Sequence, residues 1–217
     1  MSDGASGAGR EGKVMMSKCC VENIENNPFL NSNLTAKEYL DKMIWKINND
    51  LIKISQESNN YIFGTLIICI IYDDIVTLAS VGDSPAYFIR DNNIKRIVKP
   101  KKTYQSLIDM GLFTEEQLEE YIHKLPEHMW SMFDRFIPSV VPSYSIEEYV
   151  ISSGDIIVLC CDGVSDYVNE NELIKLIDHT NISNSVNDII DIAKQNSIKE
   201  RNKNQYDDIT LIIYQHI

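Results

Sequence analysis

Four short-chain acids lie at the edges of apolar runs, where a folded sheet could gather them around a hard cation. Two of them, Asp3 and Asp162, are each followed directly by glycine. Asp83 comes just after another apolar run, and Asp207 comes just before the last one. Their types and placement point to metal-assisted phosphate chemistry.

Mg²⁺ and Mn²⁺ prefer oxygen ligands, and the short side chain of aspartate holds its carboxylate close to a rigid backbone. A glycine beside such an aspartate lets the backbone approach the ion, and its carbonyl can coordinate too. Two ions about 3.5–4 Å apart can activate a shared water for attack on a phosphoryl group. Taken one at a time, each motif is more often an ordinary turn or strand start. Only the order of all four along the chain favours a metal site.

The chain is acidic and has the composition of a globular domain. It has 217 residues, 44% of them hydrophobic, and a formal net charge of -12. No block of Lys and Arg resembles a nucleic-acid footprint, so we expect neither a nucleic-acid nor a membrane partner. The chain is also expected to be a monomer. A surplus of acids also repels phosphorylated substrates, so a phosphate site here needs cations.

Several other functional classes find no support in the sequence. No apolar segment is long enough to cross a bilayer, and residues 1–20 lack the apolar region of a signal peptide. No cysteine is followed by the arginine of a cysteine-phosphatase loop, and neither a Walker loop nor a G-x-S-x-G motif is present. The cysteines are therefore predicted to be small buried residues in a reducing cytoplasm. They are Cys19, Cys20, Cys69, Cys160 and Cys161.

Helical patterns occur at both ends of the chain. Residues 4–12 are predicted to form a loop and residues from about 13 to 26 a helix. A longer helix then begins at a capping box formed by Thr35 and Glu38. Two more helices are predicted at about 170–178 and 184–195.

Strand patterns fill most of the remaining sequence. They are predicted at 62–72, 75–81, 86–90, 94–98, 145–151, 155–161 and 208–215. Short connections predict that the first four strands form an antiparallel meander, and that the next two form a hairpin around residues 152–154. Strands that are apolar on both faces need another sheet on one side and helices on the other.

The acidic motifs, taken in chain order, resemble those of the metal-dependent protein phosphatases, the type 2C or PPM family. The two most specific stretches are Val81-Gly82-Asp83-Ser84-Pro85-Ala86-Tyr87 and Gly154-Asp155-Ile156-Ile157-Val158-Leu159-Cys160-Cys161-Asp162-Gly163-Val164-Ser165-Asp166. The others are Ser2-Asp3-Gly4-Ala5-Ser6-Gly7 and Asp207-Asp208-Ile209-Thr210. Residues 105–121 are also similar to the flap segment of bacterial members.

This resemblance implies an α+β fold, a four-layer sandwich of two antiparallel β-sheets flanked by helices. It implies one phosphatase-like domain over residues 1–217, with a flap-like insertion at about 101–144. The implied activity is hydrolysis of phosphoserine and phosphothreonine in proteins by attack of a metal-bridged water. Two Mn²⁺ or Mg²⁺ ions would be the cofactors, with a third ion as in bacterial members.

The resemblance also assigns roles to individual acids, and no other side chain is expected to be catalytic. Asp3 would ligate both ions of the central pair, and the carbonyl of Gly4 would bind one of them. Asp162 and Asp207 would ligate the other ion, and Asp83 would form the third site together with Asp162. Two further acids, Asp166 and Asp208, would lie beside these ligands without binding an ion directly.

The start of the chain departs from the family pattern. The arginine that holds the substrate phosphate in the family, and an acidic residue of its metal site, lie on a strand upstream of the first Asp-Gly. Here only Met1 and Ser2 precede Asp3. The chain is therefore expected to be N-terminally incomplete, and Asp3 is expected to fray because nothing holds its backbone. The alternative function is a catalytically impaired binding or regulatory module on the same fold.

Three smaller departures lie inside the motifs themselves. Many members have a histidine just after the first Asp-Gly, where this chain has Ala5 and Ser6. Pro85 stands where an arginine often follows Gly-Asp-Ser. Asp208 replaces the usual asparagine after the last ligand, which adds negative charge beside the site.

Overall fold

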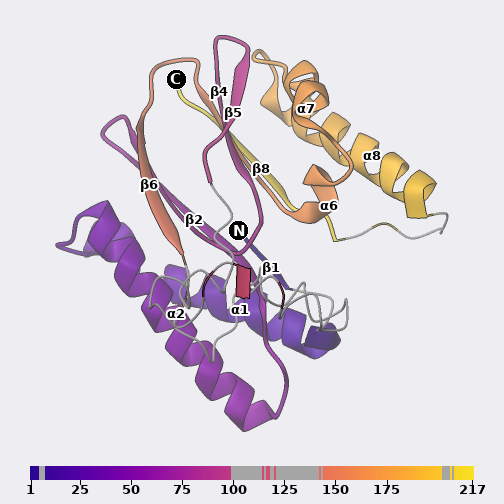
Figure 1. Cartoon of the computed structure of the whole chain (residues 1–217). Helices are drawn as coiled ribbons and strands as arrows, with labels where there is room; N and C mark the ends of the chain where they lie inside the picture. Colours follow the sequence, from indigo (N-terminus) through magenta and orange to yellow (C-terminus); the bar gives the residue numbers. More distant parts are fainter. Residues whose placement is uncertain are drawn as a thin grey trace.

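Two antiparallel sheets face each other, and helices cover their outer faces (Figure 1). This computed structural model describes residues 1–4, 8–98, 144–201 and 208–217, with 114, 116–117, 120, 142 and 206 between them. Asp207 and almost all of the predicted flap at about 101–144 lie outside the described residues. The four-layer α+β sandwich expected from the sequence is confirmed.

The first sheet carries two long helices on its outer face. Its strands, in spatial order, are β1 (Ser2–Gly4), β2 (Gly64–Tyr72), β3 (Ile75–Val81) and β6 (Ser145–Val150). The helices are α1 (Gly9–Asn26) and α2 (Ala36–Ser58), joined through a 3-10 turn at Phe29–Asn31. The capping box predicted at Thr35 and Glu38 is present at the start of α2. Leu40, Ile44 and Leu51 of α2 are buried in the core between these helices and the sheet.

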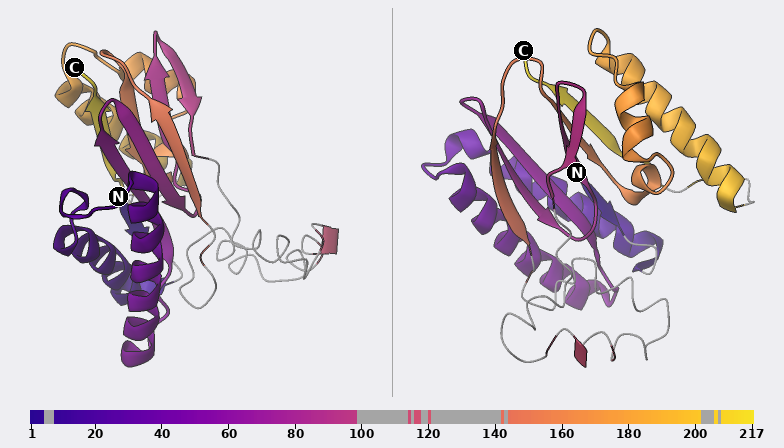
Figure 2. Two further views of the ribbon diagram at one scale, coloured as in Figure 1. Left: turned by 90° about the vertical axis from the view of Figure 1, so that its left-hand side faces the viewer. Right: turned by 45° about the horizontal axis from the view of Figure 1, so that its top comes forward.

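The second sheet is covered by the C-terminal helices. Its strands, in spatial order, are β5 (Asn93–Arg96), β4 (Ala86–Arg90), β7 (Ile156–Cys160) and β8 (Leu211–Gln215). The helices are α6 (Asp162–Ser165), α7 (Glu170–Leu176) and α8 (Ile182–Arg201), and Figure 2 shows them on the face away from the first sheet. No helix among the described residues is long and apolar enough to cross a membrane.

Buried side chains also fill the space between the two sheets. Ile67 and Leu78 of the first sheet belong to one cluster of buried side chains with Ile157 and Leu159 of the second. Both faces of β2 and β7 are therefore covered, one by the other sheet and one by helices. This explains why their sequences read as unbroken apolar runs.

Two strand pairings predicted from short connections are wrong. Strand β3 pairs with β2 and β6, while β4 pairs with β5 and β7, so residues 82–85 cross from one sheet to the other. The predicted hairpin around 152–154 is also a crossing, because β6 and β7 belong to different sheets. A short link can join two facing sheets as well as two neighbouring strands, and apolar patterning does not distinguish them.

The predicted loop over 4–12 is wrong from residue 9 onward, where α1 begins. Glycine is a poor helix former, but Gly12 lies against the backbone of Tyr61. A methyl group at Gly12 would be 2.3 Å from the carbonyl oxygen of Tyr61. Tertiary packing here outweighs the local propensity on which the loop prediction depended.

Candidate metal centre

Asp3 is the central residue of β1 and is held by the neighbouring strand. It pairs with Thr65 of β2, and Gly4 pairs with Gly64. The amino group of Met1 also donates a hydrogen bond of 2.8 Å to the carbonyl of Ile67. The expectation that Asp3 frays is therefore wrong, because an antiparallel ladder holds its backbone.

Glycines let the chain pack closely around Asp3. A methyl group at Gly64 would lie 2.2 Å from the carbonyl oxygen of Asp3, and one at Gly4 would lie 2.5 Å from the Cα of Lys13. Any other residue at either position would push β1 away from β2 or from α1. The short strand that carries Asp3 is thus fixed between a sheet and a helix.

Asp162 begins α6, and only Cys161 separates it from the fully buried strand β7. Its neighbour Gly163 meets the segment that leads into β8. A methyl group at residue 163 would be 2.2 Å from the carbonyl oxygen of Asp208. The amide of Cys161 donates a 3.2 Å hydrogen bond to the carbonyl of Thr210, which holds the same segment from the other side.

These two elements bring Asp3 and Asp162 together from different sheets. Their carboxylate oxygens and the sulfur of Cys161 all lie within 4.8 Å of one another. Asp3 and Asp162 are both partly exposed, so an ion and its waters can reach them. Two facing carboxylates suit a hard divalent cation such as Mn²⁺ or Mg²⁺.

Cys161 supports the backbone at this site. Its sulfur donates a 3.2 Å hydrogen bond to the carbonyl of Asp208 and accepts one of the same length from the amide of Thr210. Burial, together with the charges of Asp3 and Asp162, raises the pKa of its thiol to about 11. The side chain is therefore a neutral thiol near pH 7 in the metal-free protein. Sequence reasoning treated it only as a buried apolar residue, although it directly precedes the Asp-Gly step.

Asp83 lies in the crossing that follows β3. Gly82 there adopts a φ of 91°, and the hydroxyl of Ser84 shares a 2.6 Å hydrogen bond with that of Thr65, the strand partner of Asp3. Arg96 donates a 2.9 Å hydrogen bond to the carbonyl of Asp83. Asp83 does not belong to the three-residue group of possible ligands found among the described residues. The third ion site stays a prediction.

Two of the remaining predicted acids, Asp166 and Asp208, lie near Asp162. Asp166 ends α6, where its amide donates a 3.0 Å hydrogen bond to the carbonyl of Asp162, and its side chain is exposed. Asp208 forms an ion pair of 3.2 Å with Lys13 of α1. Lys13 thus offsets the negative charge that Asp208 adds beside the site. The two residues are 195 positions apart, and no sequence motif predicted their pairing. Asp207 lies outside the described residues.

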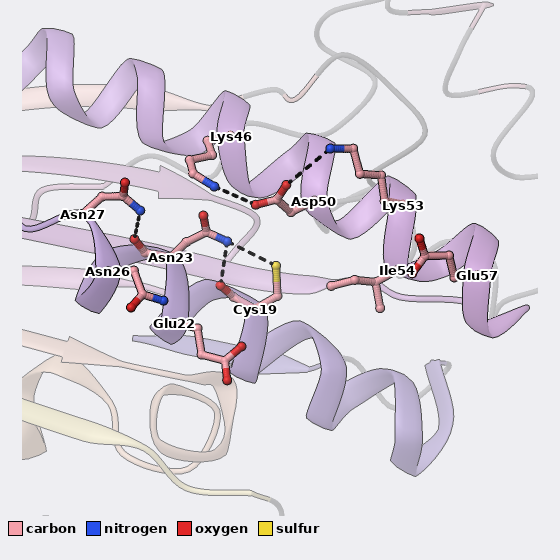
Figure 3. Close-up of a pocket in the computed structure, with 10 residues that line it drawn as sticks. All are labelled: Cys19, Glu22, Asn23, Asn26, Asn27, Lys46, Asp50, Lys53, Ile54 and Glu57. Atoms are coloured by element: carbon pink, nitrogen blue, oxygen red, sulfur yellow. Dashed lines mark hydrogen bonds and ion pairs between the residues drawn. The ribbon is translucent and has the colours of Figure 1, made fainter.

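A hollow of about 380 Å³ between α1 and α2 has a different character (Figure 3). Asp50 of α2 pairs there with Lys46 at 2.9 Å and with Lys53 at 4.0 Å. Asn23 donates hydrogen bonds to the carbonyl and sulfur of Cys19, whose pKa burial raises to about 11. These groups satisfy one another, and nothing in the hollow suggests catalysis.

Comparisons with known proteins agree with this picture. No protein-family model matches the chain. The serine/threonine protein phosphatase PstP of Mycobacterium tuberculosis is 28% identical over 131 residues, which are 60% of this chain and 24% of that protein. The chain thus spans about a quarter of the length of this curated relative.

Solved structures resemble nearly the whole chain. The catalytic domain of PstP, solved with two manganese ions, has a TM-score of 0.67 at 20% identity, and covers 98% of this chain and 84% of its own. PppA of Pseudomonas aeruginosa, a regulatory component of T6SS, has a TM-score of 0.74 at 17% identity, and covers 99% and 84%. The PPM serine/threonine phosphatase MsPP of Mycobacterium smegmatis has a TM-score of 0.65 at 15% identity, and covers 100% and 86%. The chain therefore has the fold of the bacterial PPM serine/threonine phosphatases.

Proposed function

We propose that this chain is a metal-dependent phosphatase that hydrolyses phosphoserine and phosphothreonine in proteins. The observation that carries the proposal is the meeting of the Asp3 and Asp162 carboxylates, which come from two different sheets. Carboxylates of like charge repel one another at close range, so a divalent cation bound between these two would stabilise the arrangement. The named phosphatases of the same fold, one of them solved with two manganese ions, support this reading.

In this proposal the chain supplies ligands for two Mn²⁺ or Mg²⁺ ions. Asp3 and the carbonyl of Gly4 would hold one ion, and Asp3, Asp162 and Asp207 the other. Asp83 would contribute to a third ion. When bound, such ions activate water and neutralise charge on the phosphoryl group.

The fold holds two residues of this proposed set, Asp3 and Asp162, in place. The β1–β2 ladder and the packing of Gly4 on α1 hold Asp3. The N-terminal position of Asp162 in α6 directs its carboxylate group from the end of a rigid, buried strand. Because both anchors are rigid, the geometry does not need to be organised when substrate arrives.

The alternative function, an impaired binding module, was motivated by the missing upstream arginine and acid of the family and by the expected fraying of Asp3. The pairing of Asp3 with Thr65 removes the second reason. We therefore favour the active enzyme. Its substrates would be phosphorylated proteins, and we propose that it acts as a monomeric single domain in the cytoplasm, without nucleic-acid or membrane partners. The net charge of -12 and five free cysteines support this setting.

The decisive experiment removes one carboxylate charge. Wild-type protein should hydrolyse p-nitrophenyl phosphate and a phosphothreonine peptide when Mn²⁺ is added. Asp162→Asn should lower kcat/KM by at least about 100-fold, which corresponds to about 2.7 kcal/mol of transition-state stabilisation. Calorimetry should show that the same variant binds Mn²⁺ more weakly.

Asp191→Asn is the matched control, because Asp191 lies on α8 and its side chain is 68% exposed. It removes the same charge and should keep wild-type activity. Full activity in Asp162→Asn would refute the proposed function.

A further inference from the structure

A hollow beside Asp3 collects positive charge in a chain that is otherwise acidic. It has a volume of about 460 Å³ and includes Asp3, Asp208 and three cations of α1, namely Arg10, Lys13 and Lys18. Arg10 and Lys13 are three positions apart and therefore neighbours on the helix surface, and Lys18 lines the same hollow further along α1. With 20 Lys and Arg against 32 Asp and Glu in the chain, this local excess of cations over the acids marks the hollow as a place for an anion.

The three cations differ in what already binds them. Lys13 pairs with Asp208 at 3.2 Å, and Lys18 pairs with Glu22 at 3.7 Å. Arg10 is exposed and makes no hydrogen bond or ion pair with any described residue. Its guanidinium carries five N–H donors in a planar fork that matches two oxygens of a phosphate.

The packing of α1 fixes where Arg10 can reach. Gly4 lies directly against the backbone of Lys13, so the second turn of α1 cannot move away from β1. Arg10 lies three residues before Lys13 and therefore on the same side of the helix. Both side chains line the hollow that Asp3 lines. An anion in this hollow can therefore lie between Asp3, on the metal side, and Arg10.

We propose that Arg10 binds the phosphate group of the substrate, and that Lys13, held by Asp208, assists it as a positioning residue. This inference rests on the proposed function, because it assigns the phosphate-binding group of the same site. The chain has a net charge of -12, and its acids would repel a phosphate dianion. The positive charge of Arg10 would reduce this repulsion at the site.

The test compares Arg10→Gln with Lys53→Gln in the full chain. Lys53 is on α2, lines a different hollow, and its side chain is 71% exposed. Both variants lose one positive charge, so a difference between them cannot come from net charge alone. Calorimetry measures the binding of Mn²⁺ and then of inorganic phosphate to the Mn²⁺-loaded protein, and p-nitrophenyl phosphate gives kcat and KM.

Arg10→Gln should weaken phosphate binding about tenfold or more, as expected for loss of a charge-assisted hydrogen-bonding pair. KM should rise by a similar factor, while Mn²⁺ affinity stays unchanged. Arg10→Lys should lose less phosphate affinity, because it keeps the charge but not the fork. Lys53→Gln should match wild type throughout.

Failure of this inference can be separated from failure of the proposed function. If wild type is an Mn²⁺-dependent phosphatase but Arg10→Gln binds phosphate as well as Lys53→Gln, only the role of Arg10 is wrong. If the chain binds no Mn²⁺ and hydrolyses nothing, the proposed function is wrong. In that case phosphate titration of the metal-free protein still tests the role of Arg10. Equal phosphate affinities in Arg10→Gln and Lys53→Gln would overturn the inference.

Discussion

Glycines set the geometry of the candidate metal centre as much as the acids do. Gly64 lies against the carbonyl of Asp3, and Gly163 lies against the carbonyl of Asp208. In both places a side chain would separate two segments that come from distant parts of the sequence. The Asp-Gly step at residue 162 therefore supplies an acid and also the space in which the C-terminal segment lies.

The close approach of Gly163 to Asp208 predicts that Gly163→Ala lowers the stability of the protein. Glycine to alanine within a helix normally stabilises it by up to about 1 kcal/mol. Here the added methyl group would lie 2.2 Å from the carbonyl oxygen of Asp208, so the C-terminal segment must shift. We expect the free energy of unfolding, measured with urea, to fall by about 1–3 kcal/mol, as for other overpacked sites.

Ser165→Ala is the control, because it lies in the same short helix α6 and adds no atoms. It should change stability by less than about 0.5 kcal/mol. A gain in stability for Gly163→Ala would show that the segment before β8 does not pack on α6 in solution.

At the scale of elements, the two short turns that join neighbouring strands differ from the two short links that cross between sheets, from β3 to β4 and from β6 to β7. Asp73 and Asp74 both have positive φ, as do Asp91 and Asn92. Two consecutive residues with positive φ fit the twist of a tight hairpin, and these turns join β2 to β3 and β4 to β5. Asn and Asp adopt this conformation more readily than other non-glycine residues, so the sequence could predict both hairpins.

The sequences of the two short crossing links indicate their conformation less clearly. In the link from β6 to β7 only Gly154 has positive φ, at 93°, and its neighbours are stabilised by side chains from elsewhere. Asp155 accepts hydrogen bonds from Arg90 at 2.8 and 2.5 Å and from the amide of Ser152 at 2.6 Å. Arg90, on β4, also donates to the carbonyl of Val150 on β6. The course of this link between the sheets depends on these distant partners. For this reason strand positions were predicted well but sheet membership was not.

Asp155→Asn should test this link, with a clear dependence on pH. The hydrogen bonds from Arg90, and then from the amide of Ser152, hold the pKa of the Asp155 carboxyl below its ordinary value. A lowered folded-state pKa contributes stability above the unfolded value near about 3.9, and that stability is lost as pH falls through the folded pKa. The variant should lose roughly 1–3 kcal/mol at pH 7, and the difference from wild type should shrink below about pH 4.

The measurement is urea unfolding of both proteins from pH 3 to pH 7. Asp191→Asn, which removes an exposed acid of α8, should show no such pH-dependent difference. A loss that stays constant down to pH 3 would mean that the charge of Asp155 does not contribute.

For the whole molecule, the arrangement of helices and sheets in layers was predicted better than the contacts within the candidate site. Apolar strands and amphipathic helices required a helix–sheet–sheet–helix arrangement, and the resemblance placed Asp3 and Asp162 together. The sequence pattern could not predict contacts between residues that only the folded chain brings together. Cys161 hydrogen-bonds to the segment before β8, which requires β7 and β8 to pair although they are far apart in the sequence. Lys13 of α1 pairs with Asp208 only once the two sheets have packed.

The position of the site between the sheets predicts that metal binding stabilises the whole domain. Asp3 belongs to the first sheet and Asp162 follows the second, so an ion bound to both links the two halves of the sandwich (Figure 1). A ligand that binds only the folded state at about 100 times its Kd contributes about 2.7 kcal/mol. In thermal scans, Mn²⁺ should therefore raise Tm by roughly 5–10 °C for a domain of this size. EDTA should reverse the shift and Asp191→Asn should keep it, whereas Asp162→Asn should lose most of it because one of the two links is gone. An equal shift in Asp162→Asn would place the bound ion elsewhere and separate metal-dependent stability from the proposed centre.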